Sequence, residues 1–251
     1  TSTTNSLGNI TMTGYDPNTD NLSSSVTTGS SAGNLVQPPM VKEITAITTP
    51  TNDNTPSYTF KSSKAGTITY GGSCSSDNTS ATADNNTIIF NTLSDATYSN
   101  CTLYVTSSTG VKGNTFSVTP FTVDTTAPSL SQVTAVPTPS NDNTSSYTFS
   151  SNEAGDITYG GSCNSSTSSA SAANNTITFN ALSEETYDNC TITVTDSVGN
   201  ASSALSVNTF VVDTTAPTVS SVSSSTSDGA YKLNDNITVT VTFNENVIVE
   251  N

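Results

Sequence analysis

The chain contains an internal repeat, and this feature constrains its fold more than any other. Residues 38–126 align with residues 127–215 at a constant offset of 89 residues and without a gap. Both copies contain the segment Ile-Thr-Tyr-Gly-Gly-Ser-Cys, and the sequence Asp-Thr-Thr-Ala-Pro spans the end of each copy. A unit of this length can bury a core of its own, whereas the shorter unit of a solenoid cannot. The repeat therefore predicts two small domains in tandem.

The repeat divides the chain into four parts. We expect a Thr-, Ser-, Gly- and Asn-rich segment at 1–37, domains at 38–126 and 127–215, and the start of an incomplete third domain at 216–251, with the polypeptide continuing beyond Asn251. The first part has the composition of a flexible linker. Two stretches within it, Asn9–Thr13 and Asn34–Val36, also suit strands, either of an earlier domain or donated to a neighbouring subunit.

Short apolar runs of period two predict an all-β fold. In the second unit we expect strands at 130–136, 145–151, 156–162, 168–173, 175–181, 190–195 and 203–212, separated by turns of Gly, Asn, Asp, Ser and Pro. About seven short strands in a unit of this length are typical of an antiparallel two-layer sandwich. Its inward face would carry Val133, Tyr147, Phe149, Ile157, Tyr159, Ile177, Phe179, Leu182, Ile192, Val194, Phe210 and Val212.

The four cysteines fall two to a repeat, with the same separation of 27 residues in each. This spacing favours disulfides between Cys74 and Cys101 and between Cys163 and Cys190. A zinc site is the alternative, but the chain has no His and no Cys-x-x-Cys pair. In a seven-stranded sandwich the third and sixth strands are antiparallel neighbours, and the cysteines sit where the end of one meets the start of the other. Such regular disulfides indicate export to an oxidising compartment.

The composition excludes several classes of function. With five basic and twenty acidic residues, the net charge of −15 would be repelled by phosphate, so we expect no nucleic-acid partner. The chain has no His, and no Ser or Cys has a partner that would activate it, so we do not expect an enzyme. No apolar run is long enough to cross a bilayer, so we expect no membrane span.

Three stretches carry a resemblance to a known family. They are the Asp-Thr-Thr-Ala-Pro junctions, the loop Thr195–Asn200 and the stretch Thr242–Val247. Together they resemble the bacterial immunoglobulin-like repeats of large secreted surface adhesins, over residues 38–251. The resemblance implies tandem immunoglobulin-like β-sandwiches of about seven strands each, joined like beads on a string. It also implies a spacer role in cell adhesion outside the cell, neighbouring domains as partners, and calcium bound at the junctions between domains.

The calcium expectation can be compared between the two repeats. At the start of the second unit, Asp124 of the linker would meet loops that carry Glu153, Asp156 and Asp196, and the equivalent positions of the first unit are Leu35, Lys64, Thr67 and Ser107. Four carboxylates at one place repel one another unless a cation lies among them, and oxygen ligands in this number suit Ca²⁺. Solvated surface charge is the alternative. Because the four positions change together, independent scatter is the weaker explanation.

The next junction would repeat this arrangement with Asp213 and Glu245, together with a loop beyond Asn251. Calcium would then convert a flexible junction into a stiff one by tying the linker Asp to loops of the following domain. Extracellular calcium modules bind with dissociation constants as weak as about 10⁻⁴ to 10⁻³ M, so such sites fill only after export.

Three functions remain open at this point. The first is a spacer in a bacterial cell-surface adhesin, which predicts many further copies of the unit. The second is a subunit of an extracellular, pilus-like filament, in which residues 1–37 or the third unit complete a sandwich in another chain. The third is an accessory module of a secreted enzyme that acts on polysaccharide, which predicts a row of exposed aromatic side chains that the sequence does not show. The spacer fits best, and the filament is the alternative.

Overall fold

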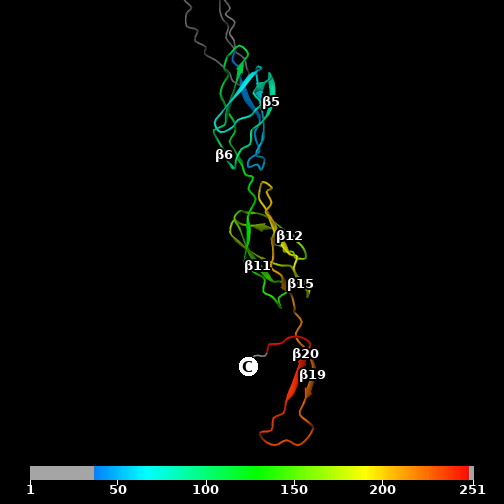
Figure 1. Ribbon diagram of the computed structural model, residues 1–251. Coiled ribbons are helices and arrows are strands. Elements are labelled where there is room, and N and C mark those ends of the chain that lie inside the picture. Colours follow the sequence, from blue (N-terminus) through cyan, green and yellow to red (C-terminus); the bar gives the residue numbers. More distant parts are fainter. Residues whose placement is uncertain (1–36, 249–251) are drawn as a thin grey trace, which may run out of the picture. The chain divides into compact units, whose positions relative to one another are not determined.

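The structure is a computed structural model that describes residues 37–248. Within this range the chain forms strands and turns and no helix (Figure 1). Consequently, none of these residues belongs to a helix of the length and apolar character that spanning a membrane requires. The candidate strands Asn9–Thr13 and Asn34–Val36 lie outside the described residues.

The first unit contains nine short strands: β1 (Val41–Thr45), β2 (Ser57–Ser62), β3 (Gly66–Gly71), β4 (Ser80–Ala81), β5 (Asp84–Ile89), β6 (Ala96–Tyr98), β7 (Thr102–Ser107), β8 (Phe116–Ser117) and β9 (Phe121–Val123). They form sheets with the orders β1-β2-β5, β4-β3-β7-β8 and β6-β9, in which neighbouring strands are antiparallel.

The second unit repeats this pattern: β10 (Leu130–Thr134), β11 (Ser146–Ser151), β12 (Gly155–Gly160), β13 (Ser169–Ala170), β14 (Asn174–Thr178), β15 (Thr186–Tyr187), β16 (Thr191–Thr195), β17 (Leu205–Ser206) and β18 (Phe210–Val211). The sheet orders are β10-β11-β14, β13-β12-β16-β17 and β15-β18. In both units the end of the last strand also meets an early segment in a parallel bridge, Thr51 with Val123 and Ser140 with Val212. The fold is all-β and consists of immunoglobulin-like antiparallel sandwiches, as the sequence predicts.

Each sandwich has its own hydrophobic core, as the alternation of apolar and polar residues along the strands predicts. Tyr58 and Phe60 of β2 are 0% exposed, as are Tyr147 and Phe149 of β11. The buried residues of the first cluster all lie between 41 and 123, and those of the second between 136 and 212. The two cores therefore share no buried residue in the described part of the chain.

One predicted core residue is wrong. Val133 is 47% exposed, whereas Val136, which is not among the predicted core residues, is 2% exposed. The cause is a bulge in β10, where the pairing with β11 shifts between Gln132 and Thr134. An extra residue in one strand reverses the alternation of faces from that point onward. Tyr159 and Leu182 are only partly buried, but both pack against the core.

The predicted strand at 203–212 is also wrong in its extent. It consists of two short strands, β17 and β18, which belong to different sheets. Between them, the side chain of Asn208 accepts a hydrogen bond from the backbone N–H of Val136 at 2.9 Å and donates one to the carbonyl oxygen of Val136 at 3.0 Å. Asn208 thus occupies the place of a backbone partner while the chain crosses from one sheet to the other. The short strand β15 was not predicted.

The structure contains disulfides between Cys74 and Cys101 and between Cys163 and Cys190. Each joins the segment after one central strand to the residue before its antiparallel neighbour, β3 to β7 and β12 to β16. All four cysteines are buried, and the described part of the chain has no free thiol.

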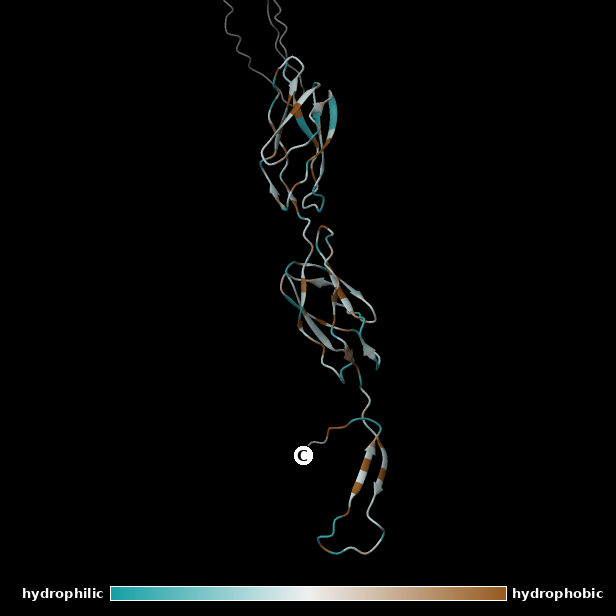
Figure 2. Cartoon of the chain, viewed as in Figure 1, coloured by the Kyte–Doolittle hydropathy of each residue, from teal (hydrophilic) through white to brown (hydrophobic). Residues whose placement is uncertain are grey.

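Residues of the third unit form a two-stranded antiparallel sheet, β19 (Val219–Ser224) and β20 (Val239–Phe243). Hydrophobic and polar residues alternate along β20 (Figure 2), as they do along β2 and β11 of the first two units, where the hydrophobic side chains face the core. Val239 is 58% exposed and Val241 is 45% exposed. In this unit, therefore, Val239 and Val241 are exposed, whereas Phe243 on the same face of β20 is partly buried.

Candidate metal centre

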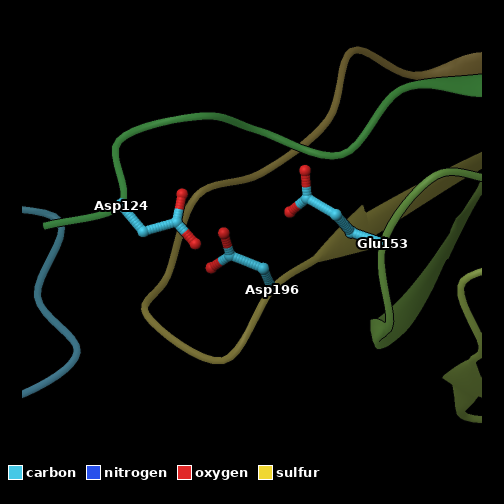
Figure 3. Close-up of side chains that lie close together, drawn as sticks. All are labelled: Asp124, Glu153 and Asp196. Atoms are coloured by element: carbon cyan, nitrogen blue, oxygen red, sulfur yellow. The ribbon is translucent and has the colours of Figure 1, made fainter. Parts of the chain in front are cut away.

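Three carboxylates from separate parts of the sequence converge at one place. Asp124 follows β9 in the segment that leaves the first sandwich, Glu153 lies in the turn between β11 and β12, and Asp196 follows β16. One carboxylate oxygen from each residue lies within 4.8 Å of the others, and all three residues are partly buried. Figure 3 shows the three side chains pointing toward one another. A cation at this place would have ligands from three different segments.

The Asp196 carboxylate is held by the loop that follows it. Its Oδ1 atom accepts hydrogen bonds from the backbone N–H groups of Val198 and Asn200, both at 2.9 Å, and its Oδ2 atom accepts one from the Asn200 side chain at 2.8 Å. Burial alone would raise the pKa of Asp196, but the hydrogen bonds from Asn200 and Val198 outweigh it and lower the pKa below its ordinary value. The Asp196 carboxylate is therefore negatively charged and held in a fixed orientation without a bound ion.

Asn200 also connects this loop to the linker. Its side-chain amide donates a hydrogen bond to the backbone carbonyl oxygen of Asp124 at 2.9 Å. The backbone N–H of Asp124 donates to the carbonyl oxygen of Thr51 at 2.9 Å, which extends the pairing at the end of the first sandwich. Asp124 is thus held through its backbone from both sides, and its carboxylate is directed at the other two.

Glu153 is the member of the group whose negative charge is disfavoured, because its carboxyl has a raised pKa. Its turn is fixed by Ser151, whose hydroxyl donates to the carbonyl oxygen of Glu153 at 2.6 Å. Burial raises the pKa of the Glu153 carboxyl, and the negative charges of Asp124 and Asp196 raise it further. A hydrogen bond from the side chain of Asn152 to the Glu153 carboxylate partly offsets this rise, and a bound cation would relieve the remaining repulsion.

The spacing of the three carboxylates fits calcium. Oxygen ligands lie about 2.3–2.6 Å from Ca²⁺, so two ligands on opposite sides of the ion are about 5 Å apart. The separation of up to 4.8 Å between the three oxygens agrees with this dimension. Three protein carboxylates would leave room for water or backbone carbonyl oxygens in the six to eight ligand positions of Ca²⁺.

The other predicted ligands lie outside this group. Asp156 lies within β12, opposite Thr195 of β16, and its side chain is exposed. Asp213 accepts a hydrogen bond from the backbone N–H of Thr215 at 3.2 Å. The Oε1 atom of Glu245 is buried and has no hydrogen-bond partner among the described residues.

Two residues of the site were not predicted from the sequence. Asp95, in the loop before β6, contributes its negative charge to the raised pKa of Glu153. Its equivalent in the second unit is Glu184, so the comparison of the two repeats shows no change of charge at this position. Asn200 is replaced by Val111 in the first unit. It therefore changes together with the acids, and this change could have identified it.

Comparisons with known proteins give a similarity in structure but none in sequence. No family model and no curated protein matches the sequence. Among solved structures, the chain is similar to one described as the D00-D0 domain of Intimin, with a TM-score of 0.31 and 12% sequence identity, over 70% of this chain and 99% of that one.

Proposed function

We propose that this chain is a non-enzymatic spacer of a bacterial cell-surface adhesin, built from immunoglobulin-like domains and stiffened by calcium bound between them. The observation that carries this proposal is the convergence of Asp124, Glu153 and Asp196 from three separate segments to within 4.8 Å. One of these carboxylates comes from the linker and two come from loops of the second sandwich. An ion that binds all three fastens the linker to the sandwich that follows it.

The mechanism is the removal of freedom from the linker. Without the ion, the three like charges repel one another, and the repulsion favours separation of Asp124 from Glu153 and Asp196. With the ion, each carboxylate gains an attractive partner, so the same three residues hold the linker in place. Extracellular calcium modules bind with dissociation constants of about 10⁻⁴ to 10⁻³ M, so the site is empty inside the cell and filled outside it.

Export agrees with the cysteine chemistry. Each sandwich carries one buried disulfide, and disulfides persist in oxidising compartments. Domains at 38–126 and 127–215, and the beginning of a third at 216–251, are part of the same proposal. Their separate cores and their repeated strand order support it.

A second calcium site at the following junction belongs to the proposal. Asp213 lies 89 residues after Asp124, and Glu245 follows Asn244, which bonds Thr218 as Asn152, the residue before Glu153, bonds Ser129. The buried Oε1 atom of Glu245 has no hydrogen-bond partner in the described part of the chain, and a carboxylate oxygen in this condition gains most from a cation.

Thermal unfolding and small-angle scattering of the chain, in millimolar calcium and in chelator, test the spacer mechanism. We expect calcium to raise the melting temperature and to narrow the distribution of particle dimensions. The double variant Asp124→Ala with Asp196→Ala should lose both effects. Asp188→Asn, which changes an exposed acid outside the group, should retain both. Equal responses of the double variant and the wild type would refute the calcium site.

A second candidate function is a subunit of an extracellular filament. In the first two units, β2 and β11 pair on one side with β1 and β10 and on the other with β5 and β14. Strand β20 pairs with β19 alone among the described strands, and Val239 and Val241 are exposed. A strand donated by another chain would pair with the edge of β20 that no described strand occupies. Polymers whose mass rises with protein concentration would support a filament, and a constant monomer mass would exclude it.

A further inference from the structure

The linker after the first sandwich is held by an acid of that same sandwich. The Oδ1 atom of Asp95 accepts hydrogen bonds from the backbone N–H and the hydroxyl of Thr125, at 2.9 and 2.7 Å. Its Oδ2 atom accepts one from the hydroxyl of Thr126 at 2.5 Å. Hydrogen bonds to an ionised carboxylate are shorter and stronger than those between neutral groups. We call this arrangement of Asp95, Thr125 and Thr126 the acid clamp.

The second sandwich contains an equivalent clamp with a different acid. Glu184 accepts hydrogen bonds from the backbone N–H of Thr214 at 3.0 Å and from its hydroxyl at 2.5 Å. It also accepts bonds from the hydroxyl of Thr215, at 2.7 and 2.8 Å. The same pair of threonines is bound in both units although the acidic side chains differ in length. The clamp therefore recurs as a feature of the repeat.

The other end of the linker is held by the sandwich that follows. The side-chain oxygen of Asn152 accepts a hydrogen bond from the backbone N–H of Ser129 at 2.6 Å, and the backbone N–H of Asn152 donates to the carbonyl oxygen of Ser129 at 3.3 Å. Asn244 makes the same two bonds with Thr218, at 2.7 and 3.0 Å. We call Asn152 and Asn244 the asparagine anchors.

At each junction, only two residues lie along the chain between the threonines of the acid clamp and the residue that the asparagine anchor binds. They are Ala127 and Pro128 at the first junction and Ala216 and Pro217 at the second. The ring of proline fixes its φ near −65°, and it restricts the preceding residue to extended conformations. Pro128 is also buried. Few backbone torsions therefore remain free between one anchored segment and the next.

We propose that bending between consecutive repeats is confined to the Ala-Pro pair, because Asp95 or Glu184 clamps the residues before it and Asn152 or Asn244 anchors the residue after it. Asp95 and Glu184 are positioning residues: they set the direction in which the linker leaves its own sandwich. This restraint needs no metal ion. Its bonds are distinct from those of the proposed calcium site, because the clamp and the anchor join protein atoms to one another and use none of the carboxylates of Asp124, Glu153 and Asp196.

Nitrogen-15 relaxation of the whole chain in chelator tests this proposal. In the wild type we expect order parameters near about 0.85 for Thr125, Thr126 and Ser129, as in a rigid backbone. In Asp95→Ala, the values for Thr125 and Thr126 should fall below about 0.6, the range of flexible segments, while Ser129 keeps its value. In Asn152→Ala, the order parameter of Ser129 should fall below about 0.6, while Thr125 and Thr126 keep their values.

Asp95→Glu is the conservative variant, because the second repeat uses Glu at the same position. It should restore the order parameters of both threonines, which a general loss of stability would not predict. Asp188→Asn, an exposed acid of the second sandwich, is the control and should change neither end of the linker. The proposal is refuted if Asp95→Ala leaves Thr125 and Thr126 rigid. It is also refuted if these residues are flexible in the wild type until calcium is added, an outcome that would leave the calcium site itself intact.

Discussion

The side-chain amide of Asn200 donates hydrogen bonds to the backbone carbonyl oxygen of Asp124 at 2.9 Å and to the carboxylate of Asp196 at 2.8 Å. One uncharged residue thus connects the linker to the loop that carries a second proposed ligand. It places no atom in the acidic group itself, but it sets the position of two of its three members.

Replacing Asn200 with Ala should weaken calcium binding while all three carboxylates remain. Loss of a residue that orients metal ligands typically lowers affinity about 10- to 100-fold. Isothermal titration calorimetry of the full chain should show this decrease. Val111→Ala, the change at the equivalent position of the first unit, is the control. In that unit the equivalents of Glu153 and Asp196 are Lys64 and Ser107, so no acidic group is present for residue 111 to orient. Wild-type affinity in Asn200→Ala would show that Asn200 does not orient the site.

Glu153 should make stability depend on pH in the absence of calcium. Burial and the charges of Asp124 and Asp196 raise its pKa in the folded state above the unfolded value, so the folded state holds the proton more tightly. This contribution to stability is fully present below the unfolded pKa and is lost as the pH rises through the folded pKa. In chelator at neutral pH, Glu153→Gln should therefore melt at a higher temperature than the wild type.

Melting curves in chelator between about pH 3 and pH 8, a range that brackets ordinary carboxyl pKa values, provide the measurement. The difference between Glu153→Gln and the wild type isolates Glu153 from Asp196, whose pKa is shifted downward and whose contribution changes in the opposite direction with pH. Calcium at neutral pH should reverse the order of the two proteins. A difference in melting temperature that stays constant across the pH range would contradict this account.

The sequence was informative about the site where the repeats differ and silent where they agree. Glu153 and Asp196 could be identified because Lys64 and Ser107 replace them in the first unit. Asp95 could not be found in this way, because its equivalent is also an acid and the comparison shows no change. Asp156 is predicted as a ligand on the same ground as Glu153, because its equivalent in the first unit, Thr67, is not an acid. It lies within β12, however, where the alternation of side chains along the strand decides which face of the sheet it is on.

Each disulfide should stabilise its own sandwich and leave the other unaffected. A bridge that closes 27 residues contributes about 3.5 kcal/mol in the chain-entropy model. Replacing Cys163 and Cys190 with Ala should therefore lower the free energy of unfolding of the second unit by about this amount. Urea unfolding should show two transitions, and only the midpoint of the second unit's transition should shift to a lower urea concentration than in the wild type. The matching change at Cys74 and Cys101 should move the other. A shift of both transitions together would contradict two independent cores.

The fold class could be predicted because it depends on patterns that the sequence shows directly, namely the period-two alternation and the spacing of turns and cysteines. The register beyond an irregularity could not. The bulge after Gln132 exposes Val133, and the sequence between Leu130 and Val136 contains no residue that marks it. Likewise, Asn208 separates β17 from β18 through bonds to Val136, a residue far away in the sequence.

The bulge gives opposite expectations for two valines three residues apart. Val136 is 2% exposed, so Val136→Ala removes two buried carbon atoms at about 0.8 kcal/mol each and leaves a cavity, and the second unit should lose at least about 1.5 kcal/mol. Val133 is 47% exposed, so Val133→Ala should stay within about 0.5 kcal/mol of the wild type. Urea unfolding of the second unit compares the two variants directly. A larger loss for Val133→Ala would mean that β10 follows uninterrupted alternation and that the bulge is absent in solution.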